Sequence, residues 1–102
     1  MGSFEFQVLI AIENGRGDAY GVSIRRFISE EYSKTVSYGA LYTTLSRLEK
    51  KGFVVSRMGS PSSVRGGRRK KFYKLSSVGA TSLSSFRAEM KSMIGFAGVS
   101  HV

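Results

Sequence analysis

Apolar residues recur at helical spacing along the first half of the chain and change to strand-like spacing after residue 52. Residues 4–14 carry apolar side chains on one helical face and end at an Asn-Gly pair. Residues 19–32 form a second amphipathic segment, and Asp18 before it is a residue type that caps helix N-termini. Gly21 lies inside this segment, at a cost of roughly 1 kcal/mol relative to Ala, which a close helix–helix approach would explain.

A third helix is predicted over residues 37–52. Ser37 can cap its start, and Gly52 after two lysines suits its end. Its apolar stripe consists of Leu41, Leu45 and Leu48. The remaining surface carries aromatic, hydroxyl and cationic groups, at Tyr38, Tyr42, Thr43, Ser46 and Arg47. This pattern fits an ordinary surface helix or a helix that presents one face to a partner.

The short turn over residues 33–36 joins two amphipathic helices, which is the arrangement of a helix-turn-helix with the second helix as the reading element. Residues 53–57 and 71–75 are β-branched and aromatic and predict two strands. The Gly-, Ser- and Arg-rich segment 58–70 between them holds the only proline, Pro61. The expected fold is therefore α+β, mainly α: a winged helix-turn-helix with three helices and a β-hairpin wing that leans on the helical core.

A final helix is expected from a cap at Ser76 or Ser77 to near Ile94. Apolar residues spaced 3, 4, 3 and 4 apart form a seam, at Leu83, Phe86, Met90, Met93 and Ala97. We interpret this seam as a homodimer interface; the alternative is that it packs on the core of its own chain. Residues 1–76 would then be the DNA-binding domain and 77–102 the dimerisation helix and tail.

The net charge of +9 indicates a polyanionic partner or an anionic membrane surface. No acidic residue occurs over positions 50–88, where half of the sixteen basic residues gather: Lys51, Arg57, Arg65, Arg68, Arg69, Lys70, Lys71 and Lys74. A solvated basic face is the simpler alternative. A membrane partner is disfavoured, because no apolar run of about 18 residues occurs and the final helix carries only two cations.

The sequence offers no constellation for catalysis. Its single histidine, His101, lies in the C-terminal tail, cysteine is absent, and Glu30 and Glu31 are adjacent and so do not share a helix face. We therefore expect no enzymatic activity, no metal and no cofactor. The lack of cysteine and of a recognisable secretory signal makes the cytoplasm the expected location.

The side chains of the third predicted helix and of the wing are of the types that bind double-stranded DNA. Arg47 can pair with guanine or phosphate, and Thr43 can meet a thymine methyl or a base edge. Tyr38 and Tyr42 can donate to phosphates, although Tyr42 can instead be half-buried against the wing. The wing supplies cations for phosphates or for the minor groove, namely Arg65, Arg68, Arg69, Lys70 and Lys71.

Three motifs in order resemble the PadR-like transcriptional regulators: DAYGVSI, SYGALYTTLSRLEKKGFV and GGRRKKFYKLSSVG. The resemblance implies a homodimeric repressor of the short, single C-terminal helix type that binds palindromic operators, with a small hydrophobic effector at the dimer interface. It assigns Ser37, Gly39, Tyr42 and Arg47 to the reading helix, and Gly67, Arg68 and Arg69 to the wing. The sequence departs from the family pattern in two ways. Thr43 stands where many members have proline, and tryptophan, which would suit an aromatic drug-binding pocket, is absent.

The leading hypothesis is thus a sequence-specific transcriptional regulator. Two alternatives belong to other classes: a sensor of aromatic or drug-like molecules at the seam of the final helix, and a basic protein that binds nucleic acid without sequence preference.

Overall fold

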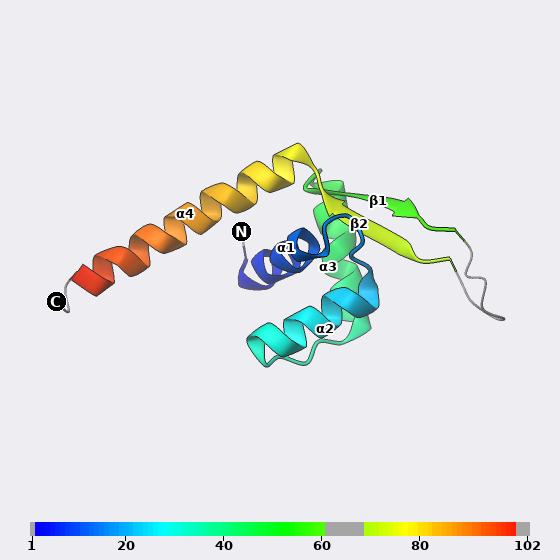
Figure 1. The fold of residues 1–102 in the computed structure, drawn as a ribbon, viewed down its shortest axis with the longest axis horizontal. Helices are drawn as coiled ribbons and strands as arrows, with labels where there is room; N and C mark the ends of the chain where they lie inside the picture. The colour runs from blue at the N-terminus through cyan, green and yellow to red at the C-terminus, as the bar shows by residue number, and fades with distance from the viewer. Residues whose placement is uncertain (1, 61–68, 100–102) are drawn as a thin grey trace.

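The computed structural model describes residues 2–60 and 69–99, with side chains as far as Ile94. In order, the elements are α1 (Ser3–Gly15), α2 (Gly21–Tyr32), α3 (Tyr38–Lys50), β1 (Val54–Met58), β2 (Lys71–Leu75) and α4 (Ser77–Val99). The first three helices form the body, and the hairpin and α4 extend from it toward opposite ends of the molecule (Figure 1). This arrangement is the winged helix-turn-helix that the sequence predicts.

The core lies where the three helices of the body meet the base of the hairpin. Leu9 and Ile12 of α1 are almost completely buried with Ile24 and Ile28 of α2. The predicted stripe of α3 joins this core, since Leu41, Leu45 and Leu48 have no exposed surface. The apolar face of α3 is therefore committed to the core, which leaves its opposite face at the surface.

The start of α2 differs from the prediction, because Asp18 does not cap it. The backbone N–H of Tyr73 donates to the carbonyl of Ala19 over 2.7 Å and holds this stretch extended beside β2. The helix therefore begins only at Gly21, with Tyr20 as its N-cap residue, and the backbone N–H of Tyr20 donates to the Ser23 hydroxyl over 2.9 Å as in a capping box. Asp18 instead pairs with Arg57 of the wing at 3.2 Å.

Both ends of α3 lie where the sequence predicts them. The Ser37 hydroxyl accepts from the backbone N–H of Ala40 over 3.1 Å, which is an N-cap contact. Gly52, just beyond the helix, has a φ of 79°, a conformation that glycine adopts at low cost. The predicted cap and stop signals are confirmed.

The wing is a two-stranded antiparallel hairpin in which Val54 pairs with Leu75 and Met58 with Lys71. Its first strand begins one residue later than predicted, because Phe53 serves the base of the hairpin, where its carbonyl accepts from the N–H of Ser76 over 3.0 Å. The Ser76 hydroxyl in turn accepts from the N–H of Gly79 over 3.0 Å and caps α4. The wing and α4 thus share one anchoring point.

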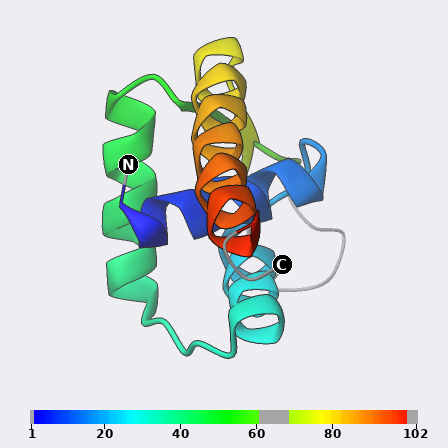
Figure 2. The ribbon, with the colours of Figure 1, turned by 90° about the vertical axis from the view of Figure 1, so that its left-hand side faces the viewer.

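Helix α4 continues to Val99, past the expected end near Ile94. It passes over α1, as Figure 2 shows, and then leaves the body (Figure 1). Leu83 is fully buried in the core of its own chain and Phe86 packs edge-to-face on Phe6, with ring centroids 4.6 Å apart. The predicted interface seam is therefore corrected at Leu83, which has no surface left for a second chain.

Met90 and Met93, further along the seam, are 39% and 68% exposed. Ile94 beside them is 67% exposed, and the side chain of Ala97 lies outside the described part of the structure. The seam thus divides into an inner segment that covers the core and an outer apolar segment at the surface. Within residues 2–60 and 69–99 no helix is both long and apolar enough to cross a membrane.

Candidate nucleic-acid interface

The outer face of α3 holds the polar residues that the sequence singles out. Tyr38 and Tyr42 are 40% and 48% exposed, and Thr43 and Arg47 are exposed beside them, whereas Thr44 on the opposite side is buried. Thr43 and Arg47 also line a shallow depression with Ser46 and Lys50. One helix therefore presents aromatic, hydroxyl and cationic groups side by side along a surface of about the width that enters a major groove.

The two tyrosines form a stack that continues onto α2. The rings of Tyr38 and Tyr42 are 6.2 Å apart at an interplanar angle of 24°, and the guanidinium of Arg25 lies 4.6 Å from the centre of the Tyr38 ring. The hydroxyl end of Tyr42 lies against Gly21, so closely that a Cβ there would overlap it. Tyr42 thus keeps about half its surface in solvent while its tip closes on α2, and Gly21 permits the close helix–helix approach.

Ser37 and Gly39 complete the exposed N-terminal turn of α3. A Cβ built on Gly39 would meet nothing nearer than the Ser37 hydroxyl at 4.0 Å. The fold therefore does not require glycine at this position. A partner backbone that approaches this turn closely would require it.

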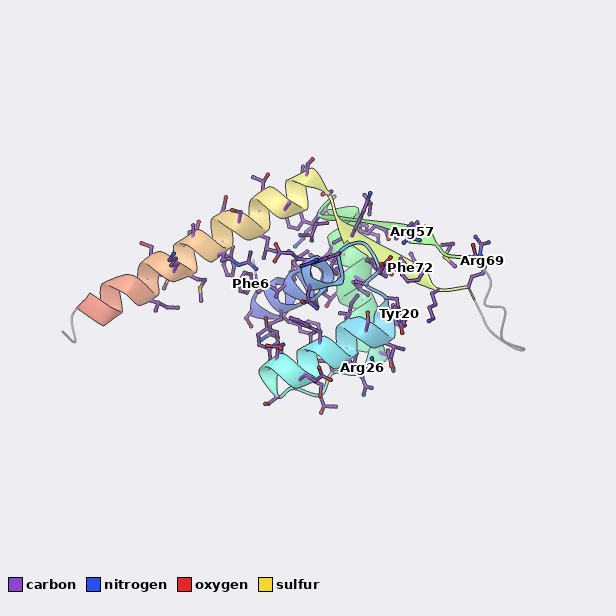
Figure 3. The ribbon with its side chains drawn as sticks, viewed as in Figure 1. Phe6, Tyr20, Arg26, Arg57, Arg69 and Phe72 are labelled. Atoms are coloured by element: carbon purple, nitrogen blue, oxygen red, sulfur yellow. The ribbon has the colours of Figure 1, made fainter. Side chains whose placement is uncertain are left out.

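The wing residues that the structure describes are held by aromatic rings and by carbonyl groups. Lys70 lies 4.5 Å from the centre of the Tyr20 ring, and Arg69 donates through Nε to the Gly59 carbonyl over 2.8 Å. Arg57 lies 4.6 Å from the ring centre of Phe72, which packs edge-to-face on Tyr20. In Figure 3, Arg57 and Phe72 lie on the part of the wing that faces Tyr20, whereas Arg69 lies further out along the wing. Arg65, Gly67 and Arg68 lie outside the described residues.

Glu49 joins α3 to the wing, a role that the sequence reading missed. Its carboxylate accepts from the Ser56 hydroxyl over 2.6 Å and lies 3.6 Å from Nζ of Lys71. Lys71 is thus a shared group rather than a free phosphate contact. The signal for this role is the position of Glu49 as the last acid before the acid-free stretch 50–88.

Four of the seven acidic side chains form ion pairs within the described part of the chain. Each of four ion pairs joins two different parts of the fold: Glu5–Lys51, Glu13–Arg87, Asp18–Arg57 and Glu49–Lys71. The hydrogen bond from Arg87 to Glu13 raises the pKa of Arg87, and burial raises the pKa of the Tyr32 and Tyr73 hydroxyls. Arg47 and Lys50 have no carboxylate within ion-pair distance in this part of the chain, so the outer face of α3 stays positive.

The described residues contain no group of three or more His, Asp or Glu side chains that could hold a metal ion. His101 lies outside them. The outer face of α3 and the basic hairpin form a surface suited to binding a polyanion. The fold and this surface together define a winged helix-turn-helix DNA-binding protein.

Comparisons with known proteins narrow that class. The family model for the transcriptional regulator PadR-like family matches residues 8–85, and the chain belongs to this family. It is therefore a transcriptional regulator and not an enzyme. A search of the curated proteins finds no match.

Several solved structures are similar to the chain. A PadR family transcription regulator from Clostridium difficile is 26% identical, with a TM-score of 0.79 over 95% of this chain and 96% of that one. A PadR-like transcription factor from Bacteroides fragilis is 23% identical, with a TM-score of 0.77 over 93% and 86%. Bacillus subtilis PadR, crystallised in complex with operator DNA, is 21% identical, with a TM-score of 0.70 over 83% of this chain and 46% of that one.

Proposed function

We propose that this regulator is a repressor that binds a palindromic DNA operator as a homodimer. The observation that carries the proposal is the outer face of α3, where Tyr38, Tyr42, Thr43 and Arg47 are exposed with no paired acid among the described residues. The complex of Bacillus subtilis PadR with operator DNA supports it. Since an operator is chromosomal, the proposal also assigns the protein to the cytoplasm.

Each side chain of this face has a contact that suits its chemistry. Arg47 and Thr43 read base edges in the major groove, and the hydroxyl of Tyr38 donates to a phosphate. Tyr42, whose hydroxyl lies against Gly21, contacts the DNA through the exposed part of its ring. Ser37 and Gly39 let the first turn of α3 approach the backbone. The wing follows the neighbouring phosphates or minor groove through Arg65, Gly67, Arg68, Arg69, Lys70 and, more weakly because Glu49 shares it, Lys71.

The outer segment of α4 supports the homodimer. Met90, Met93 and Ile94 expose a continuous apolar surface beyond the body of the domain, and Phe86 connects this surface to the core. Two-fold pairing of this segment would place two copies of α3 on two half-sites about one helical turn apart. A dimer on such an operator excludes polymerase from the same DNA.

A small hydrophobic effector would bind next to this seam. Phe53 and Phe86 line a depression of about 530 Å³ between the α1 and α4 sides of the domain, together with Glu5, Lys51 and Glu89. Six of its eight lining residues are polar, and the two phenylalanine rings supply the apolar contact for a planar ligand. Binding there would change the angle of α4 and with it the spacing of the two reading helices.

Selection of bound DNA from a random pool tests the proposal. We expect recovery of a palindrome whose binding weakens steeply with salt. Lys70→Ala should weaken binding to all DNA about equally and lower the salt slope by about one, whereas Arg47→Ala should change the preferred sequence. Equal binding to the recovered DNA, scrambled DNA and duplex RNA would instead identify a basic protein without sequence preference.

A further inference from the structure

We infer that Arg25 of α2 is a positioning residue for DNA reading: it fixes Tyr38, and through it Tyr42, in the pose that discriminates the operator from other DNA. The inference rests on the proposed function of α3. Arg25 lies outside the set of residues that the sequence marks as DNA contacts, and its role follows from three contacts in the structure.

The first contact fixes the start of α3. Nε of Arg25 donates to the carbonyl of Val36 over 2.6 Å. Val36 is buried and immediately precedes the Ser37 cap. Arg25 therefore ties α2 to the residue from which the reading helix departs, and this carbonyl lies outside the hydrogen bonds of both helices.

The second and third contacts form a stack of three planes. The guanidinium carbon of Arg25 lies 4.6 Å from the Tyr38 ring centre, and Tyr38 stacks on Tyr42 at 6.2 Å. The tip of Tyr42 then closes against Gly21. The stack thus begins and ends on α2, and both tyrosine rings are held from two sides although each is close to half exposed.

Holding these rings has a consequence for binding. A tyrosine that is free to rotate loses side-chain entropy when it contacts a phosphate, whereas a ring already in place loses little. Phosphate contacts made by fixed rings set the register of α3 in the groove, on which the base contacts of Thr43 and Arg47 depend. Scrambled DNA offers no such base contacts, so its binding does not depend on this register. Lysine cannot replace arginine in this role, because it has neither the Nε donor nor the flat guanidinium that stacks on a ring. The charge and the positioning effect of Arg25 can therefore be separated by one substitution.

Arg26 provides a matched control. It is the next residue of α2, it is exposed, and it lines the same surface depression as Arg25 and Tyr38. It projects from α2 in Figure 3, and no stacking or hydrogen-bond contact of its side chain occurs among the described residues. If loss of a surface guanidinium were by itself enough to change DNA binding, Arg26→Lys would show the same change as Arg25→Lys.

The experiment compares Arg25→Lys, Arg26→Lys and the unchanged protein on the selected operator and on scrambled DNA. We expect Arg25→Lys to bind the operator roughly tenfold more weakly, to bind scrambled DNA as before and to keep its salt slope. Arg26→Lys should match the unchanged protein on both. Operator binding by Arg25→Lys at the unchanged affinity, or equal weakening on both DNAs, would overturn the inference.

A double-mutant cycle with Tyr38→Ala then tests the route of the effect. If Arg25 acts through the tyrosine stack, Arg25→Lys should have little further effect in the Tyr38→Ala background. Additive losses would overturn the inference. Failure of the unchanged protein to prefer any DNA would overturn the proposed function itself, which distinguishes the two failures.

Discussion

Two glycines beside the tyrosine stack differ in what a side chain would meet. At Gly21 an added methyl group would overlap the Tyr42 hydroxyl, so the fold itself explains this glycine. At Gly39 the same group would enter open space in the first turn of α3. A glycine that the fold does not need, in a helix where it costs stability relative to alanine, is best explained by the close approach of a binding partner.

Gly39→Ala should therefore stabilise the protein and weaken operator binding. We expect the free energy of unfolding to rise by about 0.5–1 kcal/mol, because alanine restricts the unfolded chain and suits a helix. Urea unfolding and DNA titration of the same preparation measure both effects. Gly21→Ala is the contrast: displacement of Tyr42 should lower the free energy of unfolding by about 1–3 kcal/mol. Unchanged operator affinity of Gly39→Ala would exclude a close approach at this turn.

Single residues could be predicted from the sequence where their partners are local. The Ser37 cap contacts Ala40, three positions away, and the leucine stripe repeats within one helix. The sequence predicts a cap at Asp18, but the backbone pairing of Ala19 with the distant Tyr73 decides where α2 begins. The role of Arg25 cannot be predicted from the sequence for the same reason, since its contacts depend on how the turn between α2 and α3 folds back.

The elements α3 and the wing are joined by a few polar contacts around Glu49. The carboxylate holds Ser56 on β1 and Lys71 on β2, so it fixes the hairpin relative to the reading helix. The sequence predicts the helix and both strands from their apolar patterns, but it does not predict the angle between them. That angle is set by side-chain contacts between segments far apart in the chain.

Glu49→Gln should weaken the contacts between α3 and the wing without unfolding the domain. We expect a loss of about 1 kcal/mol in the free energy of unfolding, because the pair is partly exposed. Scrambled DNA should be bound as tightly or more tightly, since one acid is removed from a positive surface, while the preference for the operator falls. Glu31→Gln on the exposed face of α2 is the matched control and should leave that preference unchanged. Parallel behaviour of the two variants would contradict this role.

Tyr73, through which β2 contacts the body, should make the free energy of unfolding depend on pH. Burial raises the pKa of the Tyr73 hydroxyl above its ordinary value of 10.0 and outweighs the opposite effect of Lys71. The unfolded chain therefore loses this proton at a lower pH than the folded protein. The free energy of unfolding should be constant with respect to this group below pH 10.0 and fall as the pH rises above it. Urea unfolding at increasing pH should show a shallower fall for Tyr73→Phe, and identical slopes would refute the assignment.

At the scale of the whole molecule, positive charge and apolar surface are separated. Cations gather on the wing and the outer face of α3, while the outer segment of α4 on the other side of the body exposes mainly apolar side chains (Figure 1). The sequence predicts both features, from the charge distribution and the 3-4 seam. It does not predict how much of the seam the domain uses itself, because that depends on where α4 crosses α1.

This division of α4 makes the proposed dimer testable with a single charge. Met93→Glu would place a carboxylate in the centre of the outer apolar segment, where pairing of two copies would leave it buried without a partner. Because Met93 is 68% exposed in the single chain, the domain itself should stay folded. We expect sedimentation to show a monomer at concentrations at which the unchanged protein is a dimer, with unchanged circular dichroism. Its operator binding should fall by at least about a hundredfold, because the two half-sites are then bound independently.

Val78→Glu is the matched control for that experiment. Val78 is 56% exposed near the start of the same helix, close to the wing anchor and away from the outer apolar segment. A carboxylate in the first turn of a helix is electrostatically favourable, so this variant should remain folded and dimeric. A dimeric Met93→Glu protein would show that copies pair through another surface. If both variants were monomeric, the start of α4 would belong to the interface as well, and the division between an inner segment with Leu83 and Phe86 and an outer segment from Met90 would be wrong.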